Sequence, residues 1–153
     1  MKRIISIISF CIVLSFMSCD DAHSIISGGI RYVNDTCHVI TIKDYMIAYT
    51  HYYNAELSPG EDKVIVGVSA ETNLWTDDSL QYSCSNKLPL SVTVIFDNKY
   101  SVTYKRDSEG FDDMLCLYES YTYKRIRKNA GELIYTFTEK DYEYAREFGK
   151  KIE

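Results

Sequence analysis

The sequence predicts a mainly β fold, a β-sandwich of about seven strands that is followed by a short C-terminal helix. Three observations carry this prediction. Tyrosine occurs 14 times in 153 residues, and aromatic and β-branched residues favour strands. Short runs of alternating apolar and polar residues are separated by turn-forming residues, as in sandwich proteins. Glycine and proline are scarce, with seven and two copies, which argues against a disordered chain.

Two hairpins are the clearest structural signal. The first pairs residues 92–96 with 100–104 around an Asp-Asn-Lys turn, and the second pairs 121–126 with 133–137 around an Asn-Ala-Gly turn. Single strands are expected at residues 30–33, 37–42, 63–68 and 115–118. Residues 44–53 fit both helical and strand spacing, and their aromatic and threonine content favours a strand. Residues 69–87 are polar and are expected to form a long loop.

A helix is expected from about Glu139 to Phe148. Thr138 is a suitable N-cap, and Asp141 three residues later completes a weaker form of the capping box. The apolar spacing predicts a buried stripe made of Tyr142, Ala145 and Phe148.

The N-terminal segment has the order of a secretory signal. Lys2 and Arg3 precede an apolar run at residues 4–17, and Ser18 and Cys19 follow it. The run is shorter than the roughly 20 residues that a membrane-spanning helix needs. The expected organisation is a signal peptide at 1–18, a tether at 19–29 and one domain at 30–153.

Residues 16–19, Phe-Met-Ser-Cys, resemble the lipobox of bacterial prolipoproteins. This resemblance implies that Cys19 is lipidated, becomes the new N-terminus and holds the protein on a membrane. Multiple acyl chains give stable anchoring where a single chain is marginal. The acidic Asp20 and Asp21 are similar to the residues that follow this cysteine in Bacteroidota-type lipoproteins, which implies an outer-membrane location on the periplasmic or cell-surface face. The alternative is an ordinary cleaved signal with a chance cysteine.

The domain also resembles a group of small lipoproteins from the same bacteria. The resemblance rests on Val33-Asn34, on the turn at 58–61, on Val-Ile-Phe-Asp at 94–97 and on a tyrosine-rich hairpin before a short helix. It implies an immunoglobulin-like sandwich without an established activity. It assigns no functional residue beyond Cys19.

Three cysteines, Cys37, Cys84 and Cys116, remain once the signal and the lipidated cysteine are set apart. An oxidising compartment would allow one disulfide and one buried thiol, but the sequence does not choose the pair. Three buried thiols that act as small hydrophobes are the alternative.

Charge and motifs limit the function classes. The formal net charge is −5, which argues against nucleic acid as a general partner. No motif of a serine hydrolase, zinc protease, phosphate loop or EF-hand occurs. His23, His38 and His51 stand at no metal-ligand spacing. The sequence therefore predicts no catalytic residue, no cofactor and no metal site.

The long loop is the best candidate for recognition. Trp75 and Tyr82 offer an apolar ring with a polar group, which suits stacking on sugar faces; Trp75 is alternatively a core residue or loop anchor. Asp-Ser-Leu at 78–80 resembles the O-glycosylation signal of these bacteria, which implies modification of Ser79.

Four basic residues form a cluster in this acidic chain: Lys124, Arg125, Arg127 and Lys128. They could contact anionic glycans or lipid head groups. Alternatively, they protect an exposed sheet edge against aggregation.

The sequence favours a non-enzymatic envelope lipoprotein that presents a binding surface to a protein or glycan partner. One alternative is a glycan-directed enzyme, which would need two facing carboxylates. The other is an inhibitor or immunity-type lipoprotein, for which a flat apolar patch would be the sign.

Overall fold

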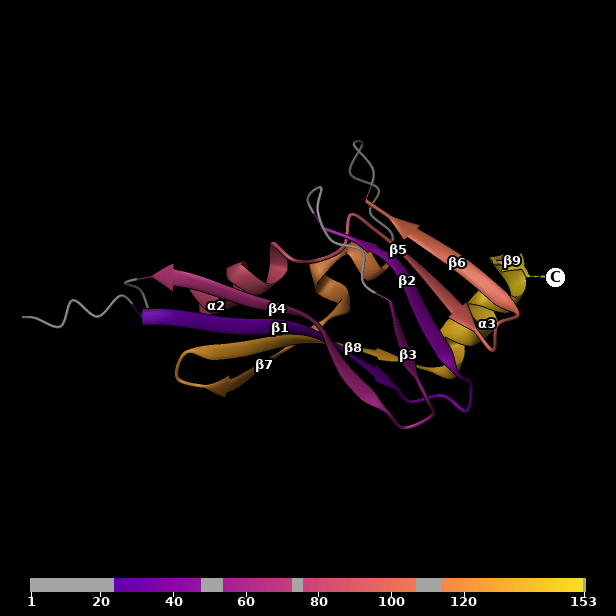
Figure 1. Ribbon diagram of the computed structural model, residues 1–153, viewed down its shortest axis with the longest axis horizontal. Helices are drawn as coiled ribbons and strands as arrows, with labels where there is room; N and C mark the ends of the chain where they lie inside the picture. The colour runs from indigo at the N-terminus through magenta and orange to yellow at the C-terminus, as the bar shows by residue number, and fades with distance from the viewer. Residues whose placement is uncertain (1–23, 48–53, 73–75, 107–113, 153) are drawn as a thin grey trace, which may run out of the picture.

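A computed structural model describes residues 24–47, 54–72, 76–106 and 114–152 (Figure 1). The described residues form nine strands in two sheets, two α-helices and two short 3₁₀-helices. This confirms the predicted mainly β, two-sheet fold with a C-terminal helix, with nine strands where about seven were expected. In this part of the chain, no helix is long and apolar enough to cross a membrane.

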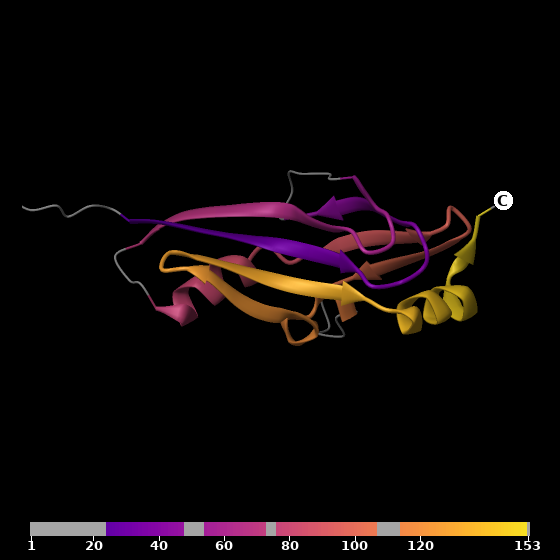
Figure 2. The ribbon, with the colours of Figure 1, turned by 90° about the horizontal axis from the view of Figure 1, so that it is seen from below.

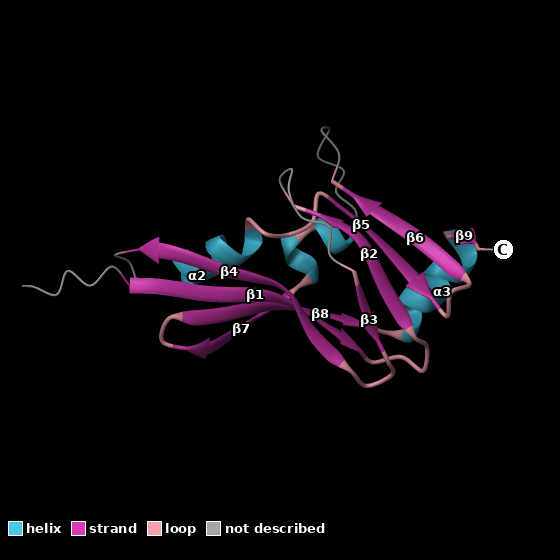
Figure 3. Cartoon of the chain, viewed as in Figure 1, coloured by secondary structure: helices cyan, strands magenta, loops and turns pink. Residues whose placement is uncertain are grey.

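Figure 3 distinguishes the helices from the strands, and the colours of Figure 1 give their order along the chain. The strands are β1 (Ser24–Asn34), β2 (Ile40–Met46), β3 (Ala55–Leu57), β4 (Asp62–Thr72), β5 (Ser91–Phe96), β6 (Tyr100–Lys105), β7 (Thr122–Arg127), β8 (Ala130–Phe137) and β9 (Lys150–Lys151). The helices are α2 (Asp77–Ser85), η1 (Met114–Cys116), η2 (Tyr118–Ser120) and α3 (Glu139–Phe148).

The first sheet has the strand order β4-β1-β8-β7, with β1 and β8 as its central strands. β1 pairs antiparallel with β4 and parallel with β8. Arg31 on β1 forms ion pairs with Asp62 of β4 and with Glu132 of β8, at 2.8 Å between Arg31 Nε and Glu132 Oε2. The hydrogen bond to Glu132 is the main cause that raises the pKa of Arg31. These ion pairs connect three neighbouring strands.

β1 begins earlier than the sequence indicated. Residues 24–29, expected in the tether, pair with β4, and from Ser27 onward they also pair with β8. The Gly28-Gly29 pair suggested a linker, but both glycines occupy ordinary strand positions between two neighbouring strands. β1 therefore starts six residues before the predicted domain boundary at residue 30.

The second sheet has the order β3-β2-β5-β6-β9 and contains the first predicted hairpin, which is confirmed. Residues 97–99 connect its strands, and Asp97 and Asn98 are the central residues of the turn from Phe96 to Lys99, with φ of 52° and 54°. Positive φ at both central positions matches the right-handed twist of the flanking strands, and Asp and Asn tolerate it well. The pairing of the second hairpin, β7 and β8, is also confirmed, but its predicted turn is wrong, because Ala130 and Gly131 already pair with β7 and the turn lies at residues 128–129. Its Gly131 leaves room for the ring of Tyr123, because a Cβ atom there would lie 2.6 Å from that ring.

Several predicted strands have other structures. β2 begins at Ile40, so Cys37 and His38 lie in the loop before it, and residues 48–53 lie outside the described residues. The segment 115–118 falls on η1, Leu117 and the start of η2, where Leu115 and Cys116 are buried without strand pairing. On β4, Ile65 is buried and its neighbour Val64 is exposed.

The predicted loop at 69–87 is wrong. β4 continues to Thr72, and α2 occupies residues 77–85. Thr76 caps α2 by accepting a hydrogen bond from the Ser79 backbone, and Leu80, Cys84 and Leu88 form a buried stripe at four-residue spacing. α2 packs on β1, β4 and β8. The segment is polar on average, so its composition did not indicate the apolar stripe that packs against the sheet.

The C-terminal helix α3 has its predicted bounds. Asp141 and Thr138 form the predicted capping box, and Ala145 is fully buried with Tyr142 packed against the core. Phe148 departs from the prediction, since it is 66% exposed. Gly149 ends the helix where a Cβ atom would lie 2.3 Å from the Ala145 carbonyl oxygen.

The core lies between the two sheets and is rich in aromatic residues. Tyr32 is fully buried, stacks on Phe137 with ring centroids 5.6 Å apart, and exchanges a 2.8 Å hydrogen bond with the Tyr121 hydroxyl. The three cysteines of the domain are free thiols: Cys84 and Cys116 are buried, and Cys37 is exposed. The structure therefore contains no disulfide among these three cysteines. The alternative of three buried thiols holds for Cys84 and Cys116 but not for Cys37.

Candidate functional site

A cavity of about 560 Å³ opens beside α3, within the size range of small-molecule sites. Residues of β6, η1, η2, β8 and α3 line it, so segments from three parts of the sequence meet there. Three of its side chains are aromatic. The lining residues are Tyr104, Met114, Ser120, Tyr135, Thr136, Thr138, Lys140, Asp141 and Tyr144.

Asp141 is the one carboxylate among the described lining residues, and structural hydrogen bonds occupy both of its oxygens. The Tyr135 hydroxyl donates to Oδ1 at 2.6 Å, and the Thr138 amide and hydroxyl donate to Oδ2 at 2.7 and 2.9 Å. Burial, followed by this bond to Asp141, raises the pKa of Tyr135 far above its usual range. Asp141 therefore closes the first turn of α3 and holds a neutral tyrosine in the cavity wall.

Exposed apolar side chains lie in the cavity lining, at Met114 and Tyr144, and next to it, at Phe148. Tyr144 and Phe148 are exposed on successive turns of α3, with ring centroids 5.0 Å apart, and Met114 is exposed on η1. Lys140, one turn before Tyr144, is an exposed cation in the lining. An apolar wall with hydroxyl groups and one cation suits a ligand that has both an apolar face and hydroxyls.

A second cluster lies where the loop between β1 and β2 meets α3. The ligand atoms of Cys37, His38 and Glu139 all lie within 4.8 Å of one another. His38 Nδ1 lies 2.6 Å from Asp97 Oδ2, and its Nε2 lies 3.4 Å from Glu139 Oε2. The Cys37 backbone amide donates to Glu139 Oε1 at 3.0 Å. The His38 ring stacks on the Tyr142 ring at 3.5 Å between centroids.

The electrostatics of this cluster follow from these contacts. The hydrogen bond from the Cys37 amide lowers the pKa of Glu139, since it favours the ionised carboxylate. A hydrogen bond to the same carboxylate raises the pKa of the Cys37 thiol. Glu139 is thus ionised at neutral pH beside the protonated thiol of Cys37.

Neither site is indicated by a local sequence pattern. Cys37 and His38 are separated from Asp97 by about 60 residues and from Glu139 by about 100, so no spacing motif connects them. On α3, the predicted stripe of Tyr142, Ala145 and Phe148 indicated a helical face, but not that Tyr144 lines a cavity.

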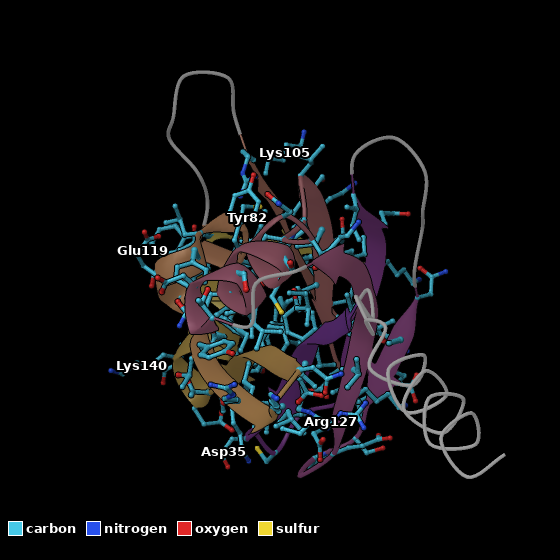
Figure 4. The ribbon with its side chains drawn as sticks, turned by 90° about the vertical axis from the view of Figure 1, so that its left-hand side faces the viewer. Asp35, Tyr82, Lys105, Glu119, Arg127 and Lys140 are labelled. Atoms are coloured by element: carbon cyan, nitrogen blue, oxygen red, sulfur yellow. The ribbon has the colours of Figure 1, made fainter. Side chains whose placement is uncertain are left out.

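Of the residues predicted for recognition, the structure describes Tyr82 but not Trp75. Tyr82 is 69% exposed on α2 and does not line the cavity, and Figure 4 shows it apart from Lys140. Trp75 and Cys19 lie outside the described residues. Ser79 is half-buried within α2, and its hydroxyl donates to the Thr76 carbonyl at 2.8 Å. Its glycosylation stays a prediction.

The basic cluster lies on the hairpin of β7 and β8, and its four side chains are exposed. Ala130, which follows the turn, pairs with both Arg127 and Ser27. The hairpin end therefore lies beside the first residues of β1, opposite α3 (Figure 2). β7 is an edge strand, so the charges also suit edge protection.

Comparisons with family models, with curated proteins and with solved structures found no significant match.

Proposed function

We propose that this chain is a membrane-anchored envelope lipoprotein that binds a glycan in the cavity beside α3, without catalysing a reaction. The cavity is the observation that carries the proposal. Its aromatic wall offers apolar faces, and Ser120, Thr136 and Thr138 offer hydroxyl groups around it. Sugars present apolar ring faces and hydroxyl edges, so one sugar unit suits this lining.

The charge state of the cavity favours binding over hydrolysis. A glycosidase uses two carboxylates about 5–9.5 Å apart. Asp141 already accepts three hydrogen bonds that close α3, and a second acid is not among the described lining residues. The enzyme alternative would need an acid that enters the cavity from elsewhere in the chain.

The exposed aromatic residues of α3 also bear on the alternative of an inhibitor or immunity-type lipoprotein. Tyr144 and Phe148 expose a paired aromatic surface on α3, and an inhibitor-type lipoprotein would use such a patch to cover a protein partner. The patch continues into the cavity lining through Tyr144. A glycan that extends beyond one sugar would reach the same surface.

The test is a glycan array probed with the purified full-length chain in detergent, followed by titration of the best ligand. Tyr144→Ala should weaken binding about tenfold, which corresponds to about 1.4 kcal/mol of lost stacking and burial. Tyr82→Ala is the matched control, because Tyr82 is also an exposed helical tyrosine but does not line the cavity. The reverse result would move the site to α2 and overturn the proposal.

The membrane anchor is supported by the lipobox-like residues and by the basic hairpin. The hairpin end lies beside Ser27, eight residues after Cys19. A basic surface near a lipidated residue would be attracted to anionic head groups, at about 1 kcal/mol per Lys or Arg close to the bilayer.

Metabolic labelling with radioactive palmitate tests the anchor. The wild-type chain should incorporate label, and Cys19→Ala should incorporate none. Cys37→Ala is the matched control, because Cys37 is an exposed thiol in the domain and should leave the label unchanged. Equal labelling of wild type and Cys19→Ala would refute lipidation at this residue.

A further inference from the structure

The cluster at the end of β1 brings together three segments that are distant in sequence. Cys37 and His38 come from the loop after β1, Glu139 is the first residue of α3, and Asp97 is in the turn between β5 and β6. Each of these four residues contacts at least one other member of the cluster through a hydrogen bond or an ion pair. The cavity beside α3 does not include them.

His38 is held in one orientation. Asp97 Oδ2 lies 2.6 Å from Nδ1, and the ring stacks on Tyr142 with an interplanar angle of 14°. A carboxylate at Nδ1 favours the tautomer with its hydrogen there, which leaves the Nε2 lone pair available. Nε2 is the atom that faces Glu139.

Asp97 is itself fixed. Its Oδ1 accepts a 2.9 Å hydrogen bond from the Val39 amide while Oδ2 contacts His38. A carboxylate that orients the second nitrogen of a ligating histidine is a recurrent feature of zinc proteins. Asp97 would therefore act as a positioning residue, without contacting the ion.

We propose that Cys37 Sγ, His38 Nε2 and a Glu139 carboxylate oxygen bind one zinc ion, with water as the fourth ligand. Zinc accepts sulfur, imidazole nitrogen and carboxylate oxygen together, whereas calcium and magnesium prefer oxygen alone. This site is independent of the proposed glycan cavity and of the lipid anchor.

The distances fit this ligand set. Zinc–ligand bonds of about 2.0–2.3 Å in a tetrahedron separate ligand atoms by about 3.3–3.6 Å. The distance of 3.4 Å between His38 Nε2 and Glu139 Oε2 already has this value. The largest separation in the cluster is at most 4.8 Å, so small side-chain rotations would complete the site.

Charge and access also favour a cation. Glu139 is ionised, and zinc would displace the proton of the Cys37 thiol, which leaves the protein as the Zn–S bond forms. Two anionic ligands would then balance the charge of the ion. Cys37 and Glu139 are exposed while His38 is half-buried, so an ion can enter from solvent.

The test uses the full-length chain in detergent, with Cys11→Ser and Cys19→Ser in every sample so that these thiols do not compete. Titration with zinc should give one equivalent bound, and cobalt should give the visible bands of a tetrahedral site with a thiolate charge-transfer band. Cys37→Ser, His38→Ala and Glu139→Gln should each weaken zinc binding at least 100-fold. Asp97→Asn should weaken it about 10–100-fold.

Glu143→Gln is the matched control, because Glu143 is an exposed carboxylate on α3 outside the cluster. It should leave zinc affinity and the cobalt spectrum unchanged. Circular dichroism of each variant confirms folding. The proposal is overturned if cobalt gives no thiolate band, if folded Cys37→Ser binds zinc as tightly as its parent, or if only copper binds.

Discussion

Asn34 is the residue that shapes the loop holding Cys37 and His38. It is completely buried, and its amide group makes four hydrogen bonds. The nitrogen donates to the carbonyls of His38 and Leu57, and the oxygen accepts from the amide and hydroxyl of Thr36. Because every hydrogen bond of this buried amide group is formed, removing the side chain would leave its buried partners unsatisfied and lower the stability of the fold.

Replacing Asn34 with Ala should lower the free energy of unfolding by about 2–4 kcal/mol, because buried polar partners lose their hydrogen bonds. Urea denaturation followed by circular dichroism measures this change. Asp35→Ala is the control, since Asp35 is the exposed neighbour (Figure 4), and it should change stability by less than about 0.5 kcal/mol. Equal effects of the two substitutions would contradict the role given to the Asn34 side chain.

The pair Asn34-Asp35 is typical of a turn, but it does not indicate that Asn34 is buried or which partners it has. Asn followed by Asp favours a turn through local hydrogen bonds, which are readable from two residues. The bond to Leu57 depends on β3 lying beside the loop, and the contact of His38 with Asp97 depends on the tip of the β5–β6 hairpin. Such contacts between distant segments are set by sheet topology, which no local pattern encodes.

Among the elements, α2 differs most from its prediction. Its mean composition is polar, so the segment suggested a loop, yet Leu80 is 1% exposed and Cys84 is fully buried. The Cys84 thiol donates to the Gly131 carbonyl at 3.4 Å, which connects α2 to β8. Two signals were present in the sequence: Thr76 as an N-cap, and an apolar residue every fourth position.

Leu80→Ala should therefore lower the free energy of unfolding by about 2–5 kcal/mol, because it removes buried methyl groups and leaves a cavity. Tyr82→Ala, on the exposed side of α2, should change it by less than about 0.5 kcal/mol. Thermal and urea unfolding of both variants give the comparison. A small effect of Leu80→Ala would mean that α2 contributes little to the packing of β1 and β8.

The hairpins and α3 were predictable because their signals are local. Alternating residues around Asp97 and Asn98 indicate a tight turn, and Thr138 with Asp141 indicates a helix start. The 3₁₀-helices around Leu115 were not predictable, since a short apolar run fits a strand equally well. Phe148 has the helical spacing of a core residue, but α3 ends there at the surface.

For the whole molecule, the buried tyrosines determine how stability depends on pH. Burial raises the pKa values of Tyr32, Tyr45 and Tyr121 well above 10. The hydroxyls are satisfied inside the core: Tyr45 donates to the Lys87 carbonyl and Tyr121 to the Leu115 carbonyl. In the folded protein these groups therefore keep their protons at a pH where the unfolded chain loses them.

The sign of the effect follows from this difference. The stabilising contribution is complete below the unfolded pKa of about 10 and is lost as pH rises toward the higher folded values. Stability should fall above about pH 10 by about 1.4 kcal/mol per pH unit for each such tyrosine. Urea denaturation at several pH values measures the slope, and tyrosinate absorbance should rise together with unfolding.

Tyr32→Phe should make this slope shallower, because it removes one of the buried ionisable groups. Stability that stays constant between about pH 10 and 12 would show that the core tyrosines ionise without unfolding the protein.

The length of β1 has a consequence for how the protein would stand on a membrane. The strand begins five residues after Cys19 and continues for 11 residues to the loop that carries Cys37 and His38. At about 3.3 Å per residue, its two ends are about 33 Å apart. With acyl chains on Cys19 and β1 upright on the membrane, the loop that carries Cys37 and His38 would lie farther from the lipid surface than the start of β1 by about that length. The paired strand β1 sets the distance between its own two ends. Lengthening the segment before Ser24 would therefore change the tilt of the domain but not that distance.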